Sequence, residues 1–165
     1  METGEPSSIW EQVAASGLAV TLRENAWAYP LLETLHILGL ALAVGGIIIF
    51  DVRLLGYARS IAVVDLSRHV LRFVLAGISI NVVTGLVLFI SDAAEFAGNR
   101  SLHVKLVLIA LAFVNAGLYQ SGPGRDVGNW DRGDTPPLRV RLHAAASIAL
   151  WLGVMTAGRM MAYLK

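Results

Sequence analysis

The sequence contains no cysteine, few charged residues and no large excess of either sign of charge. Without thiols the chain cannot form disulfides, thiolate zinc sites, iron–sulfur clusters or covalently attached c-type haem. Only 15% of the 165 residues are charged, whereas about a quarter are charged in a typical soluble domain. The net charge of +1 gives no large positive field, so the composition gives no indication of nucleic-acid binding.

Recognisable catalytic and targeting motifs are also missing. The sequence shows no Ser–His–Asp motif, nucleotide-binding loop or metalloprotease motif. It therefore offers no hydrolytic or transferase motif, and leaves open whether the chain is an enzyme, such as a redox subunit. The N-terminal stretch METGEPSSIW has no basic segment followed by a short apolar core. We therefore expect no cleaved signal peptide.

Long apolar runs take the place of charge. Four segments of 17 to 19 residues contain no Asp, Glu, Lys or Arg, and a membrane-spanning helix needs about 20 mostly apolar residues. The runs lack the alternation of barrel strands, so they predict helices. These segments are Thr34–Phe50, Phe73–Ser91, Leu106–Gly124 and Leu142–Gly158.

The predicted fold is all-α: a single membrane domain, 1–165, built as an integral membrane four-helix bundle. Pro30 and Pro136–Pro137 mark helix starts, and Asp65 and Ser101 are predicted N-caps. An amphipathic segment before the first span is predicted to lie in the membrane interface, although an ordinary surface helix is an equal alternative. The predicted boundaries are 9–24 for this helix, 30–51, 66–91, 102–120 and 138–162 for the spans, and 121–137 for a polar loop.

The distribution of Lys and Arg predicts an orientation. Eight of them lie on the side of the two loops that follow the first and third spans, and five lie on the side of both termini. The positive-inside rule then places those loops in the cytoplasm and both termini outside.

Each predicted span has one histidine: His36, His69, His103 and His143. His36 and His103 lie near the terminal side, and His69 and His143 lie near the loop side. A neutral imidazole is a good axial ligand for haem iron, and bundle cores commonly hold cofactors. One or two haem b groups, each held by a histidine pair, would then fit in the bundle. The alternative is that histidines at helix ends simply lie among the lipid headgroups.

The depth of each histidine tests the pairing. From the predicted helix starts, His69 and His143 agree in depth to within about 3 Å, whereas His36 and His103 differ by about 6 Å. His36 and His143 lie deeper in their spans than the other two histidines, although near opposite sides of the membrane. His36 is the first candidate ligand. Gly39, Ala43 and Gly46 share the face of His36. They either leave room for a macrocycle or allow close packing of helices, and we favour packing.

Other charged groups lie at the edges of the spans. Glu33, Lys105 and Arg159 could join His36 in one cluster near the terminal side, where the two cations would bind propionates or another anion. Glu33 could instead pass protons to a quinone. Snorkelling to the headgroups is the alternative for both cations, and we favour it for Lys105. For Asp51 and Arg53 we expect a local ion pair or an interface anchor.

Several segments resemble known families. The stretches YPLLETLHILGLALAVGGIIIFDVRLLG, VVTGLVLFISDAAEFAGNRSLHVKLVLIALAFVNAGLY and LWLGVMTAGRMMAY resemble an uncharacterised family of small bacterial four-helix membrane proteins, a domain of unknown function. The stretches LHILGLALAVGGIIIFDVRLLGY and SLHVKL are more distantly similar to HemJ-type protoporphyrinogen oxidases and CopD-type copper-resistance membrane domains. The resemblance implies a bacterial inner membrane location and a haem b ligand at His36, with Arg53 and Lys105 in the same pattern.

One position departs from the HemJ-type pattern. Those chains have a histidine late in the helix that holds the lysine, whereas this sequence reads AGLYQ there, with Tyr119. The resemblance therefore does not extend to that second ligand or to porphyrinogen oxidation.

Three functions follow, in order of preference. The first is a b-type cytochrome-like membrane protein that passes electrons between haem and a quinone or a redox partner protein. The second is a cofactor-free accessory or anchoring subunit that packs against other subunits of a larger membrane complex. The third is a copper or small-solute transport module.

Overall fold

The computed structural model describes residues 8–131 and 133–163, and every regular element within these ranges is helical. Four helices are long and apolar enough to cross a membrane: α3 (Ala28–Leu54), α4 (Val63–Ser91), α6 (Arg100–Ser121) and α7 (Leu138–Met160). The predicted all-α four-helix bundle is confirmed, and the chain is a multi-pass membrane protein. Helices α3, α4 and α6 extend beyond their predicted spans by one to three residues at one or both ends. Helix α7 starts at its predicted first residue and ends two residues earlier than predicted.

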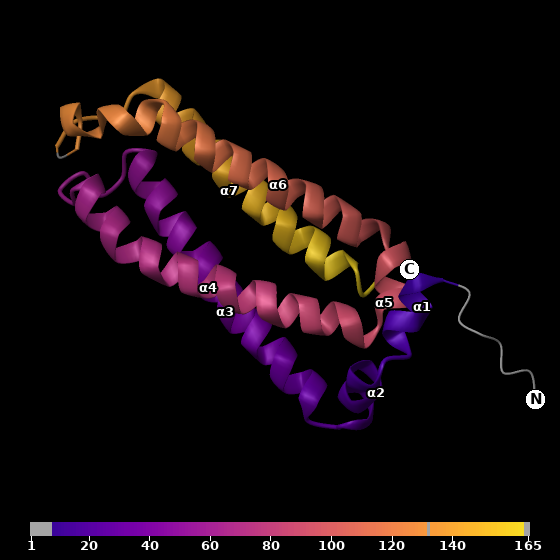
Figure 1. Ribbon diagram of the computed structural model, residues 1–165. Helices are drawn as coiled ribbons and strands as arrows, with labels where there is room; N and C mark the ends of the chain where they lie inside the picture. Colours follow the sequence, from indigo (N-terminus) through magenta and orange to yellow (C-terminus); the bar gives the residue numbers. More distant parts are fainter. Residues whose placement is uncertain (1–7, 132, 164–165) are drawn as a thin grey trace, which may run out of the picture.

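The four long helices form two hairpins. Helix α3 packs along α4 and α6 packs along α7, and the hairpins meet mainly through α3 and α7. Figure 1 shows both hairpins running in the same direction, so their connecting loops lie at one end of the bundle. We call this the loop end. The opposite end, which we call the terminal end, carries three short helices: α1 (Ile9–Ala14), α2 (Gly17–Glu24) and α5 (Ala93–Gly98).

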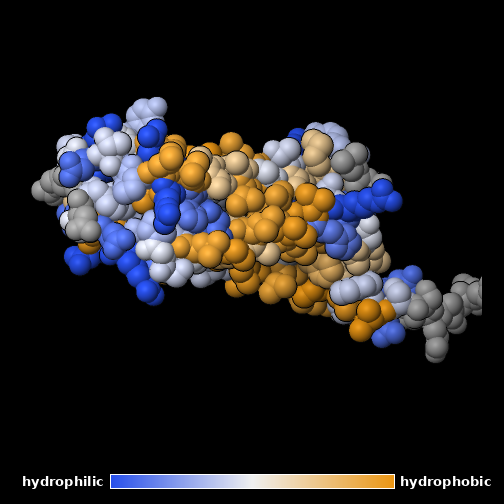
Figure 2. Space-filling view, turned by 90° about the horizontal axis from the view of Figure 1, so that it is seen from above, coloured by the Kyte–Doolittle hydropathy of each residue, from blue (hydrophilic) through white to orange (hydrophobic). Residues whose placement is uncertain are grey.

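The outer surface of the long helices is apolar. Figure 2 shows a continuous hydrophobic band between two hydrophilic ends. The band contains exposed leucine, valine, isoleucine and phenylalanine side chains from all four long helices. Exposed apolar surface on this scale is costly in water and favourable in lipid, so these faces contact the bilayer.

Small residues bring α3 and α4 into close contact. A Cβ atom on Gly77 would lie 2.6 Å from the main-chain nitrogen of Ala43 and 2.6 Å from the carbonyl oxygen of Gly39. A Cβ on Gly39 or Gly46 would likewise collide with α4 side chains. The small-residue face of α3 is therefore covered by α4, which confirms the packing interpretation of that face.

The terminal end differs from the prediction in detail. The segment 9–24 is divided into α1 and α2, because Ser16 accepts a hydrogen bond from the amide of Ala19 and starts a second helix. Trp10 packs edge-on against Phe89, with ring centroids 5.6 Å apart, and Arg23 donates to the carbonyl oxygens of Ala14 and Ser91. These contacts fix the short helices against the end of α4. An interfacial position for them in the bilayer stays a prediction.

Two predicted N-caps are wrong. Helix α6 starts two residues earlier than an N-cap at Ser101 would allow, because Asn99 accepts hydrogen bonds from the amides of Ser101 and Leu102. Asp65 lies inside the first turn of α4, whose N-cap position is Ala62. The amide of Val64 there donates to the side chain of Asp131, from the distant loop before α7. The start of α4 is thus stabilised by a residue that local sequence does not indicate.

The loop end is tied together by Arg53. Its guanidinium donates to the carbonyl oxygen of Ile61 (2.7 Å) and to that of Asp131 (2.8 Å), and the residue is 1% exposed. These two carbonyls belong to the loop between α3 and α4 and to the segment between the 3-10 helix η1 (Pro123–Asn129) and α7. Arg53 therefore connects the two loops instead of pairing with Asp51, and residues two apart on a helix do not face each other.

Candidate functional site

A cavity of about 510 Å³ lies inside the bundle near the loop end. All four long helices contribute to its wall, and α4 and α6 line it without extensive contact between them, whereas α3 and α7 pack together. Most lining side chains are aliphatic or aromatic, and polar groups are few. The volume lies within the range of about 300–1,000 Å³ that is typical of small-molecule sites.

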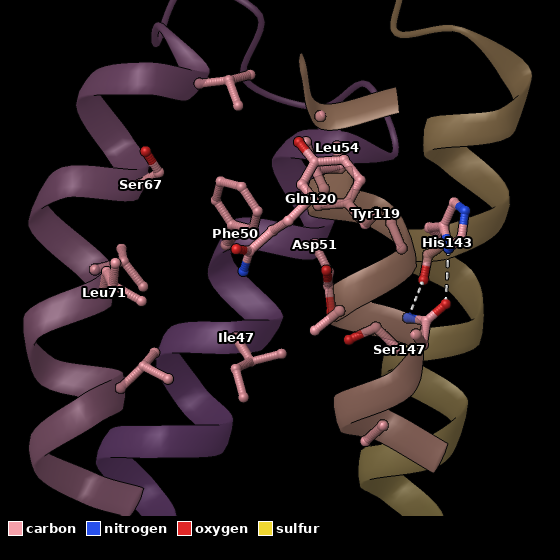
Figure 3. Close-up of a pocket in the computed structure, with 18 of the residues that line it drawn as sticks. Ile47, Phe50, Asp51, Leu54, Ser67, Leu71, Tyr119, Gln120, His143 and Ser147 are labelled. Carbon is pink, nitrogen blue, oxygen red and sulfur yellow. Dashed lines mark hydrogen bonds between the residues drawn. The ribbon is translucent and has the colours of Figure 1, made fainter. Parts of the chain in front are cut away.

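Asp51 is the acidic residue in this wall. It comes from α3, is 5% exposed, and its Oδ2 atom has no hydrogen-bond partner among the described residues. The Ser147 hydroxyl of α7 interacts with the carboxyl group and points toward it in Figure 3. A buried carboxyl group with an unpaired oxygen is expensive to maintain. Such a group inside a membrane helix is a functional candidate.

Aromatic rings border the carboxyl group. Phe50 and Tyr119 meet edge to face, with centroids 6.3 Å apart, and both lie beside Asp51 in Figure 3. The indole of Trp151 adds a third ring to the lining. The cavity thus combines flat apolar walls with one unsatisfied hydrogen-bond acceptor.

His143 lies at the α6–α7 contact and is held by Asn115. The Asn115 amide nitrogen donates to the main-chain carbonyl of His143 (3.0 Å), which fixes the orientation of the carboxamide. Its Oδ1 atom therefore faces the imidazole Nδ1 (2.8 Å), and Nδ1 must carry the hydrogen. In the neutral ring, Nε2 keeps a free lone pair. This nitrogen lies on the side of the ring away from Asp51 (Figure 3).

An open groove adjoins His143 on the outer side of α6 and α7. Arg139 and His143 both line it, together with Asn115 and apolar side chains. His143 is thus shared between the inner cavity and this outer groove.

His36 repeats the arrangement at the terminal end. Its Nδ1 lies 2.8 Å from the hydroxyl of Thr84 on α4. That hydroxyl donates its one proton to the carbonyl of Ile80 (2.7 Å), so it accepts from the imidazole and Nε2 is again left free. A Cβ on Gly85 would lie 3.3 Å from the His36 ring, so this glycine makes room for it.

His36 and His143 lie near opposite ends of the bundle. His36 and Asp51 are 15 residues apart on α3, or about 22 Å along the axis, and Asp51 contacts Ser147, one turn from His143. His69 is exposed, its Nδ1 interacts with the carbonyl of Asp65 on its own helix (2.8 Å), and it lies outside the cavity lining. His103 is exposed on α6. The structure therefore shows two separately held histidines, and the pairing of His143 with His69 or of His36 with His103 stays a prediction.

The expected cationic cluster is not assembled in the described structure. The half-buried side chain of Lys105 lies across α7, with its Nζ 3.8 Å from where a Cβ on Gly158 would be. Arg159 is exposed and donates to the hydroxyl of Tyr163, which lies just past the end of α7 (3.0 Å), and Glu33 is exposed on α3. Lys105 is thus the cation that faces the bundle near His36.

Within residues 8–131 and 133–163, no three His, Asp or Glu side chains come close enough together to hold a metal ion. A metal held by several side chains of this chain therefore has no support in the described part, whereas a metalloporphyrin needs just one or two protein ligands.

Comparisons with protein-family models, with curated proteins and with solved structures gave no match to this chain.

Sequence reasoning missed Asp51 as a site residue. Its place at the edge of the charge-free run Thr34–Phe50 suggested an interface anchor, but α3 continues to Leu54 and buries it. A signal was present, since Asp51 is flanked by apolar residues on both sides. Asn115 and Thr84 carried no sequence signal of their partners, because they meet those histidines from other helices.

Proposed function

We propose that this protein is a membrane-embedded, cytochrome b-like electron-transfer protein that holds haem b through a histidine of the bundle. The observation that carries this proposal is shared by His36 and His143. Each has its Nδ1–H fixed by a residue of the neighbouring helix, and each has its Nε2 free of hydrogen bonds from the described residues. A metal-binding histidine commonly has its second nitrogen hydrogen-bonded in this way.

The two histidines differ in how well they fit a porphyrin. His143 lies in the wall of an open groove beside Arg139, whose guanidinium would pair with a porphyrin carboxylate. His36 packs against α4, and its glycine-rich face is filled by that helix. We therefore expect His143 to be the first ligand and His36 the second. Attachment through a single histidine fits these residues, whereas a histidine pair has no support in the described arrangement.

A bound haem b would supply one-electron redox chemistry. The residues of this chain would hold and orient the haem. Asn115 fixes the orientation of His143 and leaves Nε2 as the nitrogen that could bind iron, and apolar side chains of the groove flank the ring. Both the ring nitrogen and Arg139 belong to the first turns of α7, which hold them in a fixed relation along one helix.

The membrane that fits this proposal is the bacterial inner membrane, with the loop end in the cytoplasm and the terminal end outside. The excess of Lys and Arg in the loop-end segments supports this orientation. Electron exchange with a partner protein or a quinone would then occur at or within this bilayer.

The test uses all four histidines as a matched set. Wild-type protein is expressed with ample haem supply, purified in detergent, and its oxidised and dithionite-reduced absorption spectra and pyridine haemochrome are recorded. We expect a reduced b-type band that is lost in His143→Ala. His69→Ala and His103→Ala are the controls, because both residues are exposed. If the b-type band is instead lost in His36→Ala, the cytochrome proposal stands and His36 is the haem ligand.

A colourless wild-type protein would overturn the haem proposal. The same holds if all four single variants keep the full band. The chain would then be better described as a cofactor-free accessory or anchoring subunit, and co-purification of other membrane subunits would support that description.

A further inference from the structure

The inner cavity presents an unsatisfied acceptor that the haem proposal does not use. Asp51 is 5% exposed, its Oδ2 has no partner among the described residues, and it belongs to the cavity wall. Ser147 is the polar side chain of α7 that interacts with it. Because a buried acceptor without a donor is costly, the wall is complementary to a ligand that brings a hydrogen-bond donor to this point.

We propose that this cavity binds a lipid-soluble hydroquinone, with one ring hydroxyl donating a hydrogen bond to Asp51. The ligand enters from the bilayer between α4 and α6. This inference rests on Asp51 and the cavity, and it holds whether or not the protein binds haem.

The shape and chemistry of the wall favour a flat aromatic head group. Phe50, Tyr119 and Trp151 present ring surfaces to the cavity, and aromatic side chains pack well against another ring. The remaining lining is largely aliphatic, which suits an apolar tail. A volume of about 510 Å³ accommodates a substituted ring and the first part of such a tail.

The access route favours a neutral donor over a cation. Helices α4 and α6 both line the cavity without extensive contact between them, and exposed apolar residues of these helices, such as Leu71, Leu75 and Phe113, lie in its wall. A ligand that arrives this way must dissolve in lipid, where charged groups are expensive. A phenolic hydroxyl meets both requirements because it is neutral and donates strongly. A neutral fatty acid could also donate to Asp51, but it has no ring to pack against the aromatic side chains of the wall.

The experiment compares a hydroquinone with a ligand of the same shape that cannot donate. Decylubiquinol and its dimethyl ether are titrated into the full-length protein in detergent micelles, anaerobically, and their dissociation constants are measured by calorimetry. We expect decylubiquinol to bind up to about tenfold more tightly than the ether, which is the upper end of the value of one ordinary hydrogen bond.

Two variants at Asp51 locate the interaction. In Asp51→Ala, decylubiquinol and its ether should bind with about equal dissociation constants, because the acceptor is gone. Asp51→Asn keeps one acceptor oxygen and should retain part of the preference. Thermal unfolding of each variant, without ligand, checks that the bundle is intact.

A second pair of variants tests the place of binding without touching Asp51. Ala116 lines the cavity, so Ala116→Phe should weaken the binding of both ligands. Ala110 is exposed on the same helix and lies outside the lining, so Ala110→Phe should leave both dissociation constants unchanged.

Three outcomes would overturn the inference. The first is equal binding of decylubiquinol and its ether, and the second is no detectable binding of either. The third is tight, Asp51-dependent binding of a hydrophobic amine such as dodecylamine with no preference for the hydroquinone, which would assign the cavity to cations. None of these results depends on haem, so failure here leaves the spectroscopic test of the cytochrome proposal unaffected.

Discussion

Asn115 on α6 holds His143 on α7 at two points, through the imidazole Nδ1 (2.8 Å) and through the main-chain carbonyl (3.0 Å). The carbonyl contact fixes which end of the carboxamide faces the ring, and the ring contact then fixes the imidazole tautomer. One side chain thereby joins two helices and determines which histidine nitrogen is free.

Replacing this carboxamide should destabilise the α6–α7 hairpin. Asn115→Ala leaves the imidazole N–H without its acceptor in a half-buried position, at a cost of about 1–3 kcal/mol. We expect a lower midpoint of thermal unfolding in detergent. Ser79→Ala is the control, because Ser79 is exposed on α4. An Asn115→Ala midpoint equal to that of the control would mean that the contact adds nothing to stability.

The close contact of α3 and α4 gives a prediction about glycine. Gly77→Ala places a Cβ where the main chain of α3 already lies, 2.6 Å away, so the helices must separate. Overpacking of this kind costs about 1–3 kcal/mol, which should appear as a lower unfolding midpoint.

Gly45 offers the matched control on the facing helix. A Cβ on Gly45 meets no atom within 4 Å, so Gly45→Ala should be neutral or raise stability by up to about 1 kcal/mol. If both variants shift the midpoint equally, the proximity of α3 to α4 at Gly77 does not control stability.

Arg53 should control the order of the loop end. Arg53→Met removes the donor shared by the carbonyls of Ile61 and Asp131. Each carbonyl left unsatisfied costs about 1–3 kcal/mol where it is buried. We expect faster proteolysis within 55–62 and 122–137 and a lower unfolding midpoint. Arg59→Met is the control, because it removes the same positive charge from the loop end. Arg59 is exposed and donates to the nearby carbonyl of Gly56, so its loss should lower the unfolding midpoint less.

The absence of cysteine makes the predicted orientation easy to measure. Ala94→Cys places one thiol at the terminal end, and Ser60→Cys places one at the loop end, both at exposed positions. With a membrane-impermeant maleimide on intact bacterial cells, we expect labelling of Ala94→Cys alone. Ser60→Cys should react after the membrane is permeabilised. The reverse pattern would place the loop end outside.

The sequence predicted the number, class and approximate bounds of the long helices, because charge-free apolar runs report directly on membrane spans. It also identified His36 and His143 as the deeper histidines, from their distances to helix starts. Start signals were less reliable. Asn99, two residues before Ser101, satisfies the free amides of α6, and the first turn of α4 is stabilised from the far side of the molecule by Asp131.

The partners of each polar side chain could not be predicted. Asp51 and Arg53 are two residues apart and opposite in charge, which favoured an ion pair on sequence grounds. Their side chains leave α3 in different directions, one toward Ser147 and the other toward the loop carbonyls. Such contacts depend on how helices pack, and no local periodicity encodes that.

The way the hairpins meet also bears on how the molecule is assembled. Each hairpin buries its own seam, α3 against α4 and α6 against α7, while α3 and α7 form the main contact between them. The junction of α5 and α6, near Gly98, therefore separates the long helices into two pairs along the chain, each packed along its own seam. A rotation of one pair about the α3–α7 line would change the width of the opening between α4 and α6 without breaking either seam.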